Sequence, residues 1–102
     1  MPTDLDKSIR QAIASGRVEI GLDTTMRAAV SGRARLVIVS RKCPSDRLED
    51  LQYYSSMSGV PVISYAGDSY DLGRACRKPF QVASIAVIDP GDSGILAATK
   101  GA

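Results

Sequence analysis

Histidine is absent from this 102-residue chain. Without it, neither a Ser-His-Asp triad nor a Cys-His pair can form, because the usual general base of both is missing. Zinc sites that use imidazole are excluded for the same reason. The chain also contains neither a G-x-G-x-x-G motif nor a P-loop, so we expect it to hold no metal and no cofactor.

Cysteines and long apolar runs are also scarce. The two cysteines, Cys43 and Cys76, do not belong to C-x-x-C pairs, so a thiolate metal site is not expected. No run approaches the ~20 apolar residues of a membrane span. The opening residues 1–4 (MPTD) show no apolar segment of a signal peptide. We expect reduced thiols in a cytoplasmic protein with no membrane partner.

Helical and strand patterns alternate along the chain. Helical periodicity or helix signals lie at 5–15, 23–31, 45–58 and 69–76, and strand-like runs at 18–20, 36–39, 60–64 and 82–88. Asp23 or Thr24 is expected to cap the second helix, and Ser45 the third. Residues 36–39 (LVIV) are apolar on both strand faces, which requires cover on both sides of a sheet. The sequence predicts a single domain over residues 1–102, an α/β fold built as a three-layer α/β/α sandwich around a four-stranded mixed sheet.

Positive charge is concentrated in two stretches, although the formal net charge is only +2. From residue 24 to residue 47 the only acid is Asp46, and the bases are Arg27, Arg33, Arg35, Arg41, Lys42 and Arg47. Arg74, Arg77 and Lys78 form the second group. This local concentration of positive charge, rather than the total charge, indicates an anionic partner. The simpler alternative is that these residues belong to solvated surface faces.

Two catalytic motifs are present only in part. Residues 91–94 (GDSG) match the nucleophile motif of trypsin-like proteases, but the serine has no base, and we interpret the segment as a turn. Cys43 follows a buried strand and precedes a helix near Arg41 and Arg47, a setting that lowers a thiol pKa. A phosphatase loop requires a longer spacing than the one between Cys43 and Arg47. A small phosphotransfer domain that uses Cys43 is kept only as an alternative.

Three predicted loops offer a binding site, at residues 21–25, 41–47 and 77–81. Loops that leave one edge of a sheet can converge, and these combine a flexible glycine, hydroxyls, a helix N-terminus and cations. Helix N-termini and cations hold phosphates. Phe80, the only phenylalanine, can stack on an unpaired base, as in the recognition of irregular RNA. The alternative for Phe80 is a core position at the start of a strand.

Several segments, taken in order, resemble one family. They are residues 32–39 (GRARLVIV), 53–62 (YYSSMSGVPV), 71–73 (DLG) and 89–96 (DPGDSGIL). In this order and spacing they resemble the kink-turn RNA-binding superfamily of ribosomal proteins, and within it a large-subunit family of archaea and eukaryotes. The resemblance runs from about residue 18 to residue 96.

The resemblance implies an α/β/α sandwich without catalysis that binds RNA at one end of its sheet. Gly21 matches the family's glycine after the first strand, and Thr25 matches a Ser/Thr position. Arg41 matches a common arginine, and Phe80 lies where some members place an aromatic side chain on the RNA.

Two positions depart from the family pattern. Thr24 stands where the family usually has a lysine, and Lys42 where it usually has an asparagine. Asparagine reads a base edge, whereas lysine mostly contacts phosphate. We therefore expect more of the affinity to come from contacts with the RNA backbone.

The leading hypothesis is a structural constituent of the large ribosomal subunit, in the cytoplasmic ribosome, that binds large-subunit rRNA at a kink-turn. Neighbouring ribosomal proteins are expected as further partners, and a small-molecule substrate is not expected. A protein-interaction module is a second alternative. The residues expected to bind RNA are Gly21, Thr24, Thr25, Arg27, Arg41, Lys42, Arg47, Arg77, Lys78, Pro79 and Phe80.

Overall fold

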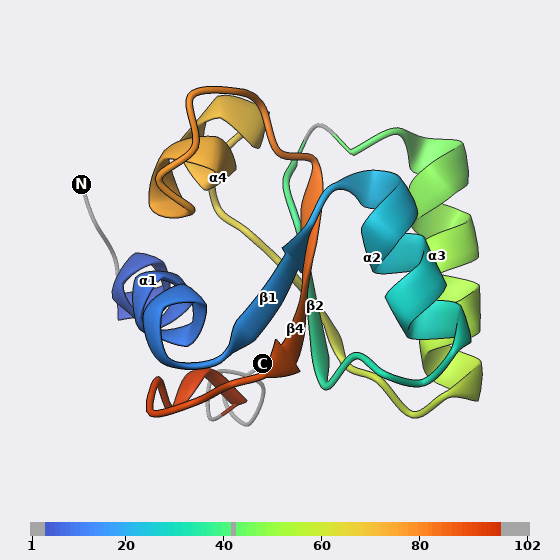
Figure 1. Cartoon of the computed structure of the whole chain (residues 1–102). Helices are drawn as coiled ribbons and strands as arrows, with labels where there is room; N and C mark the ends of the chain where they lie inside the picture. The colour runs from blue at the N-terminus through green and yellow to red at the C-terminus, as the bar shows by residue number, and fades with distance from the viewer. Residues whose placement is uncertain (1–3, 42, 97–102) are drawn as a thin grey trace.

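The structure is a computed structural model that describes residues 4–41 and 43–96. Within these residues, helices and strands alternate regularly along the chain (Figure 1). The elements are α1 (Asp4–Ser15), β1 (Arg17–Ile20), α2 (Leu22–Val30), β2 (Leu36–Val39), α3 (Ser45–Met57), β3 (Val62–Ser64), α4 (Ser69–Ala75) and β4 (Ser84–Asp89).

The strands form one mixed sheet in the order β1-β4-β2-β3. β4 is antiparallel to both of its neighbours, and β2 is parallel to β3. Ile20 at the end of β1 pairs with Ile85, and Val39 at the end of β2 pairs with Ser84. The connections that follow β1 and β2 therefore lie at the same end of the sheet as the loop that leads into β4.

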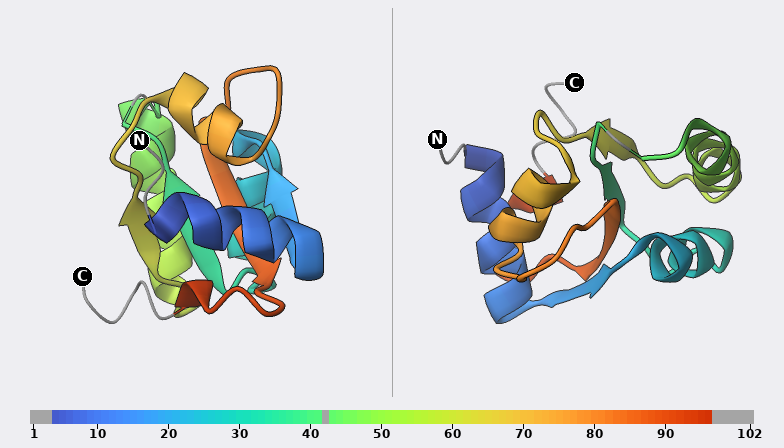
Figure 2. Two further views of the ribbon diagram at one scale, coloured as in Figure 1. Left: turned by 90° about the vertical axis from the view of Figure 1, so that its left-hand side faces the viewer. Right: turned by 90° about the horizontal axis from the view of Figure 1, so that it is seen from above.

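Helices cover both faces of the sheet. α1 and α4 lie on one face and α2 and α3 on the other, as Figures 1 and 2 show. Along β2, Leu36 and Ile38 pack into the core beneath α1 and α4, while Val37 and Val39 pack beneath α2 and α3. All four side chains are buried because each face of the strand has its own helix layer. The predicted three-layer α/β/α sandwich around a four-stranded mixed sheet is confirmed.

Two helices are not capped by the residues that the sequence predicted. α2 starts at Leu22, so Asp23 and Thr24, expected as its cap, lie inside its first turn. α3 starts with Ser45, the expected cap, and no side chain caps its first amides by a hydrogen bond. The early start of α2 depends on Gly21, whose φ of 115° lets the chain turn directly from β1 into the helix.

Two strands begin later than predicted. The Val60 amide donates to the Ser55 carbonyl at 2.8 Å, which closes the end of α3 and delays β3. The Val82 amide donates to the Ser69 carbonyl at 2.9 Å, which ties it to the start of α4 rather than to the sheet. Residues 82–83 therefore belong to the loop before β4, and this lengthens one of the three candidate binding loops.

Candidate nucleic-acid interface

The described residues of the three candidate loops meet at one end of the sheet (Figure 1). They are residues 21–25, 41 with 43–47, and 77–83, and this end of the sheet is called the loop end. Backbone hydrogen bonds connect them. The Gly21 amide donates to the Ser84 carbonyl at 3.0 Å, and the Ser40 amide donates to the Ala83 carbonyl at 2.9 Å. Because each of these two loops is bonded to the entry of β4, their positions depend on one another.

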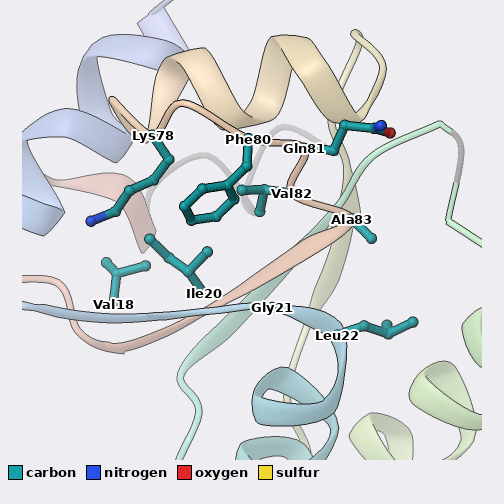
Figure 3. A pocket seen from close by; sticks show the side chains of 9 residues that line it. All are labelled: Val18, Ile20, Gly21, Leu22, Lys78, Phe80, Gln81, Val82 and Ala83. Carbon is teal, nitrogen blue, oxygen red and sulfur yellow. The ribbon is translucent and has the colours of Figure 1, made fainter.

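A pocket of about 480 Å³ opens at the loop end. Figure 3 shows Lys78 and Phe80 on one side of it and Val18 and Ile20 on the other. The remaining lining residues are Gly21, Leu22, Gln81, Val82 and Ala83. The pocket thus combines an apolar floor, one aromatic ring and one ammonium group, which suits a ligand with a flat face and a nearby negative charge.

Phe80 is 55% exposed, so the alternative of a core position for this ring is wrong. The backbone of its loop is nevertheless ordered by contacts with α4. Gly73 on α4 lies directly beneath the Phe80 carbonyl, and a Cβ atom at Gly73 would come within 2.1 Å of that oxygen. The Lys78 amide also donates to the Gly73 carbonyl at 2.9 Å. The loop therefore presents an exposed ring from an ordered backbone.

The exposed cations Arg41, Arg77 and Lys78 form no ion pair with any side chain in residues 4–41 and 43–96. They are therefore available to a charged ligand. Arg77 adopts a φ of 59°, the one non-glycine residue with positive φ in the described part of the chain, at the turn that leads from α4 to Lys78. Pro79 is exposed between Lys78 and Phe80.

Arg47 is engaged within the protein. Its guanidinium donates to the Asp23 carboxylate at 2.5 Å, so the first turn of α3 is linked to the first turn of α2. The hydrogen bond and then the charge of Arg47 hold the pKa of Asp23 below its usual value. Arg27 lies one turn further along α2, is exposed and adds to the lowering of the Asp23 pKa.

The two threonines of the first loop are not equivalent. Thr24 is half-buried, whereas Thr25 is completely buried on the inner side of α2, and its hydroxyl oxygen makes no hydrogen bond within the described residues. The Thr25 amide donates to the Gly21 carbonyl at 2.9 Å as part of the helix start. Lys42, also a predicted site residue, lies outside the described residues.

Sequence reasoning missed the floor of the pocket. Val18 and Ile20 alternate with Glu19 along β1, and this alternation was the available signal that both apolar side chains point to one face. The sequence did not reveal that the loop before β4 leaves part of that face uncovered. The pattern of apolar residues reports which side chains point inward, but not whether another segment covers them.

Cys43 does not have the environment of a nucleophile. Its side chain is buried, with the residue 8% exposed, and burial raises the pKa of the thiol more than Arg47 lowers it. The expectation of a lowered pKa is therefore wrong, because desolvation outweighs the nearby cation. Cys76 packs in the core, and burial raises its pKa to about 11.

Neither a metal-binding cluster nor a membrane-spanning helix occurs in the part of the chain that the structure describes. No group of three or more Cys, Asp or Glu side chains is placed to hold a metal ion among residues 4–41 and 43–96. In the same residues, no helix has both the length and the apolar character needed to cross a bilayer.

Comparison with known proteins identifies the family. Residues 3–97 match the model of the Ribosomal protein L7Ae/L30e/S12e/Gadd45 family, which is most of the chain. The chain belongs to this family. The family resemblance noted from the sequence motifs is thereby confirmed.

Relatives within the L7Ae/L30e/S12e/Gadd45 family include proteins named large ribosomal subunit protein eL30. The one from Methanobrevibacter smithii is 44% identical over 91% of this chain and 94% of its own length. The one from Oryza sativa subsp. japonica is 35% identical over 94% of this chain and 86% of its own length. These relatives are named as ribosomal proteins rather than enzymes, which confirms the expectation of a protein without catalytic activity.

A solved structure shows the same fold. It is that of a protein from Bacillus halodurans described as having unknown function, with a TM-score of 0.80 and 26% sequence identity. The similarity covers the whole of both chains. The α/β/α sandwich is therefore shared along the full length.

Proposed function

We propose that this chain is a structural constituent of the large ribosomal subunit in the cytoplasmic ribosome, and that it binds rRNA at a kink-turn through its loop end. Residues 1–102 would act as one RNA-binding domain. Large-subunit rRNA and neighbouring ribosomal proteins are the proposed partners. The relatives named large ribosomal subunit protein eL30 support the ribosomal role, and the geometry of the loop end supports the RNA contact.

The observation that carries the proposal is the position of Phe80. Its exposed ring stands over a pocket with an apolar floor, and the Lys78 ammonium group lies on the same side of the pocket (Figure 3). At a sharp bend, RNA exposes unpaired bases and brings phosphates close together. In the proposed mechanism Phe80 packs on an exposed base or sugar, while Lys78, Arg41 and Arg77 neutralise phosphates.

The ordered backbone of the loop end lowers the entropic cost of binding RNA. The loops are tied to one another through β4 and to α4 through Gly73, so little freedom is lost when RNA binds. Arg47 is held by Asp23 and contributes less to the phosphate contacts than its charge suggests. Thr25, being buried, contributes through the helix start rather than by direct contact.

A gel-shift comparison of a kink-turn RNA and a straight duplex, at two salt concentrations, tests the proposal. We expect tighter binding to the kinked RNA and an affinity that falls with rising salt, because cation–phosphate contacts release counterions. Equal affinity for the two RNAs would contradict shape recognition. An affinity that does not respond to salt would contradict the role of the basic loops.

A further inference from the structure

A second exposed surface lies on the outer side of α3. Figure 1 shows α3 on the outside of the molecule beside α2. Of the six large hydrophobic side chains exposed among the described residues, four belong to these two helices: Val30, Tyr53, Tyr54 and Met57. Tyr53 is 61% exposed and Met57 70%. Single exposed apolar residues are ordinary, but a group of them on adjoining helices indicates an interaction surface.

Five of the exposed residues of α3 fall on one helical face. Asp46, Glu49, Asp50, Tyr53 and Met57 follow the spacing that places side chains along one stripe, opposite the buried Leu51 and Ser55. We call these five residues the α3 outer face. Its first half is acidic and its second half is apolar, so it offers two kinds of contact in sequence along the helix.

The apolar half of this face is held in place by its neighbours. The rings of Tyr53 and Tyr54 pack edge to face, with centroids 5.3 Å apart and an interplanar angle of 72°. The Ser58 hydroxyl donates to the Ala29 carbonyl at 3.0 Å, which joins the ends of α3 and α2. The exposed Val30 is the last residue of α2 and follows Ala29, so this bond places the end of α2 that carries it beside the end of α3. Ordered aromatic side chains of this kind bind a partner with little loss of conformational entropy.

The negative charge of the α3 outer face disfavours two kinds of binding partner. Asp46, Glu49 and Asp50 form no ion pair with any described side chain, and the only base in α3, Arg47, is bound to Asp23. RNA is disfavoured because three free carboxylates repel its phosphates. A second copy of the chain is disfavoured because the same face of another copy brings no free base to these carboxylates in a symmetric contact.

We propose that the α3 outer face docks a basic segment of another protein, with lysines or arginines against Glu49 and Asp50 and apolar side chains against Tyr53 and Met57. Carboxylates at one end and tyrosine and methionine at the other are complementary to an amphipathic cationic segment. That the partner is a neighbouring ribosomal protein rests on the proposed function, whereas the chemistry of the surface does not.

The test is an NMR titration of the ¹⁵N-labelled full chain with an amphipathic lysine–leucine peptide of ~20 residues, long enough to dock as a helix along α3. A matched peptide carries glutamate in place of lysine. We expect shift changes confined to α3 and its neighbour Val30 with the lysine peptide, reduced by salt, and none with the glutamate peptide. Shifts located elsewhere, absence of binding, or equal binding of both peptides would overturn the proposal.

Variants separate this face from the rest of the surface. Tyr53→Ala combined with Met57→Ala is expected to lower the affinity for the lysine peptide about tenfold. Glu49→Gln combined with Asp50→Asn is expected to remove most of the salt dependence. Tyr70→Ala on α4 is the matched control, since Tyr70 is 57% exposed on the opposite helix layer, and it should leave the affinity unchanged.

Two further measurements distinguish the other occupants. Concentration-dependent shifts at Tyr53 without peptide would show that a second copy occupies the face, and would overturn the proposal. Kink-turn RNA that shifts Tyr53 and Met57 would overturn it as well. Failure of the wild-type chain to bind kink-turn RNA would instead contradict the proposed function, and the peptide titration would stand independently of that result.

Discussion

The loop end and the α3 outer face both expose aromatic side chains, but they surround them with opposite charges. At the loop end, Phe80 shares its side of the pocket with Lys78. On α3, Tyr53 continues a stripe that begins with Glu49 and Asp50. Aromatic rings can pack on a base or on a protein side chain, so the ring itself does not select the partner. The sign of the neighbouring charges does, and the two proposed partners, RNA and a basic protein segment, follow from that difference.

The two regions also differ in how they are built. The α3 outer face comes from a single helix, and its stripe follows from residue spacing alone. The loop end is assembled from three segments far apart in the sequence, connected by backbone hydrogen bonds through residues 83–84 and by the approach of Gly73 to Phe80. A substitution that disturbs the contacts between these segments should therefore displace the loop end and leave the α3 outer face unchanged.

The largest effect is expected from Gly73→Ala. Alanine in place of a mid-helix glycine ordinarily stabilises by ~1 kcal/mol. Here the new Cβ would lie 2.1 Å from the Phe80 carbonyl oxygen, and we expect a net destabilisation of about 1–3 kcal/mol from overpacking. The affinity for kink-turn RNA should fall as well, whereas the affinity of the α3 outer face for the lysine–leucine peptide should not change. Chemical denaturation measures the change in the free energy of unfolding, and Ser56→Ala is an exposed control on α3. A Gly73→Ala variant that is more stable than the unmodified chain would contradict the prediction.

Phe80→Ala tests the ring itself. We expect kink-turn affinity to fall by ~1–3 kcal/mol, the usual cost of losing a base–aromatic contact. The free energy of unfolding should change little, because the ring is 55% exposed. Isothermal titration with kink-turn RNA measures the loss, and Tyr70→Ala provides a control of similar exposure. Unchanged affinity would remove Phe80 from the RNA contact and weaken the contrast between the two regions.

Lys78→Gln should act mainly on the salt dependence. If Lys78 contacts one phosphate, the slope of log affinity against log salt should fall by about one. The exposed Lys7 on α1 is the control, and Lys7→Gln should leave the slope as it is. Affinities measured at four or more salt concentrations would resolve the difference. A slope identical to that of the unmodified chain would show that Lys78 makes no phosphate contact.

The smallest effect is expected from Asp23→Asn, which releases Arg47 toward the RNA. We expect affinity for kink-turn RNA to rise by less than about fivefold, because the ion pair is exposed and screened. The lowered pKa of Asp23 means that its stabilising contribution is present at neutral pH and is lost as the pH falls through that pKa. Filter binding at pH 7 measures the gain in affinity for kink-turn RNA, and Asp92→Asn is the control. A loss of affinity would contradict the prediction and would show that Asp23 is needed to hold Arg47 in position.

Much of the fold could be predicted because it depends on local patterns. The apolar run at residues 36–39 correctly required helix layers on both faces of the sheet. Element ends were less accurate, since they depend on tertiary hydrogen bonds such as the one from Val82 to Ser69. The three loops could be chosen from their composition. Their joint position at one end of the sheet required the strand order, in which β4 lies between β1 and β2.

By itself, the sequence determined the absence of histidine chemistry, the alternation of helices and strands, and the need for helices on both faces of the strand at residues 36–39. Only the tertiary structure decided that Phe80 is exposed, that Arg47 is bound to Asp23, and that burial raises the pKa of Cys43. The reason is physical. Residue spacing controls which side chains share a face of one element, whereas exposure, pairing and desolvation depend on segments that meet only when the chain folds.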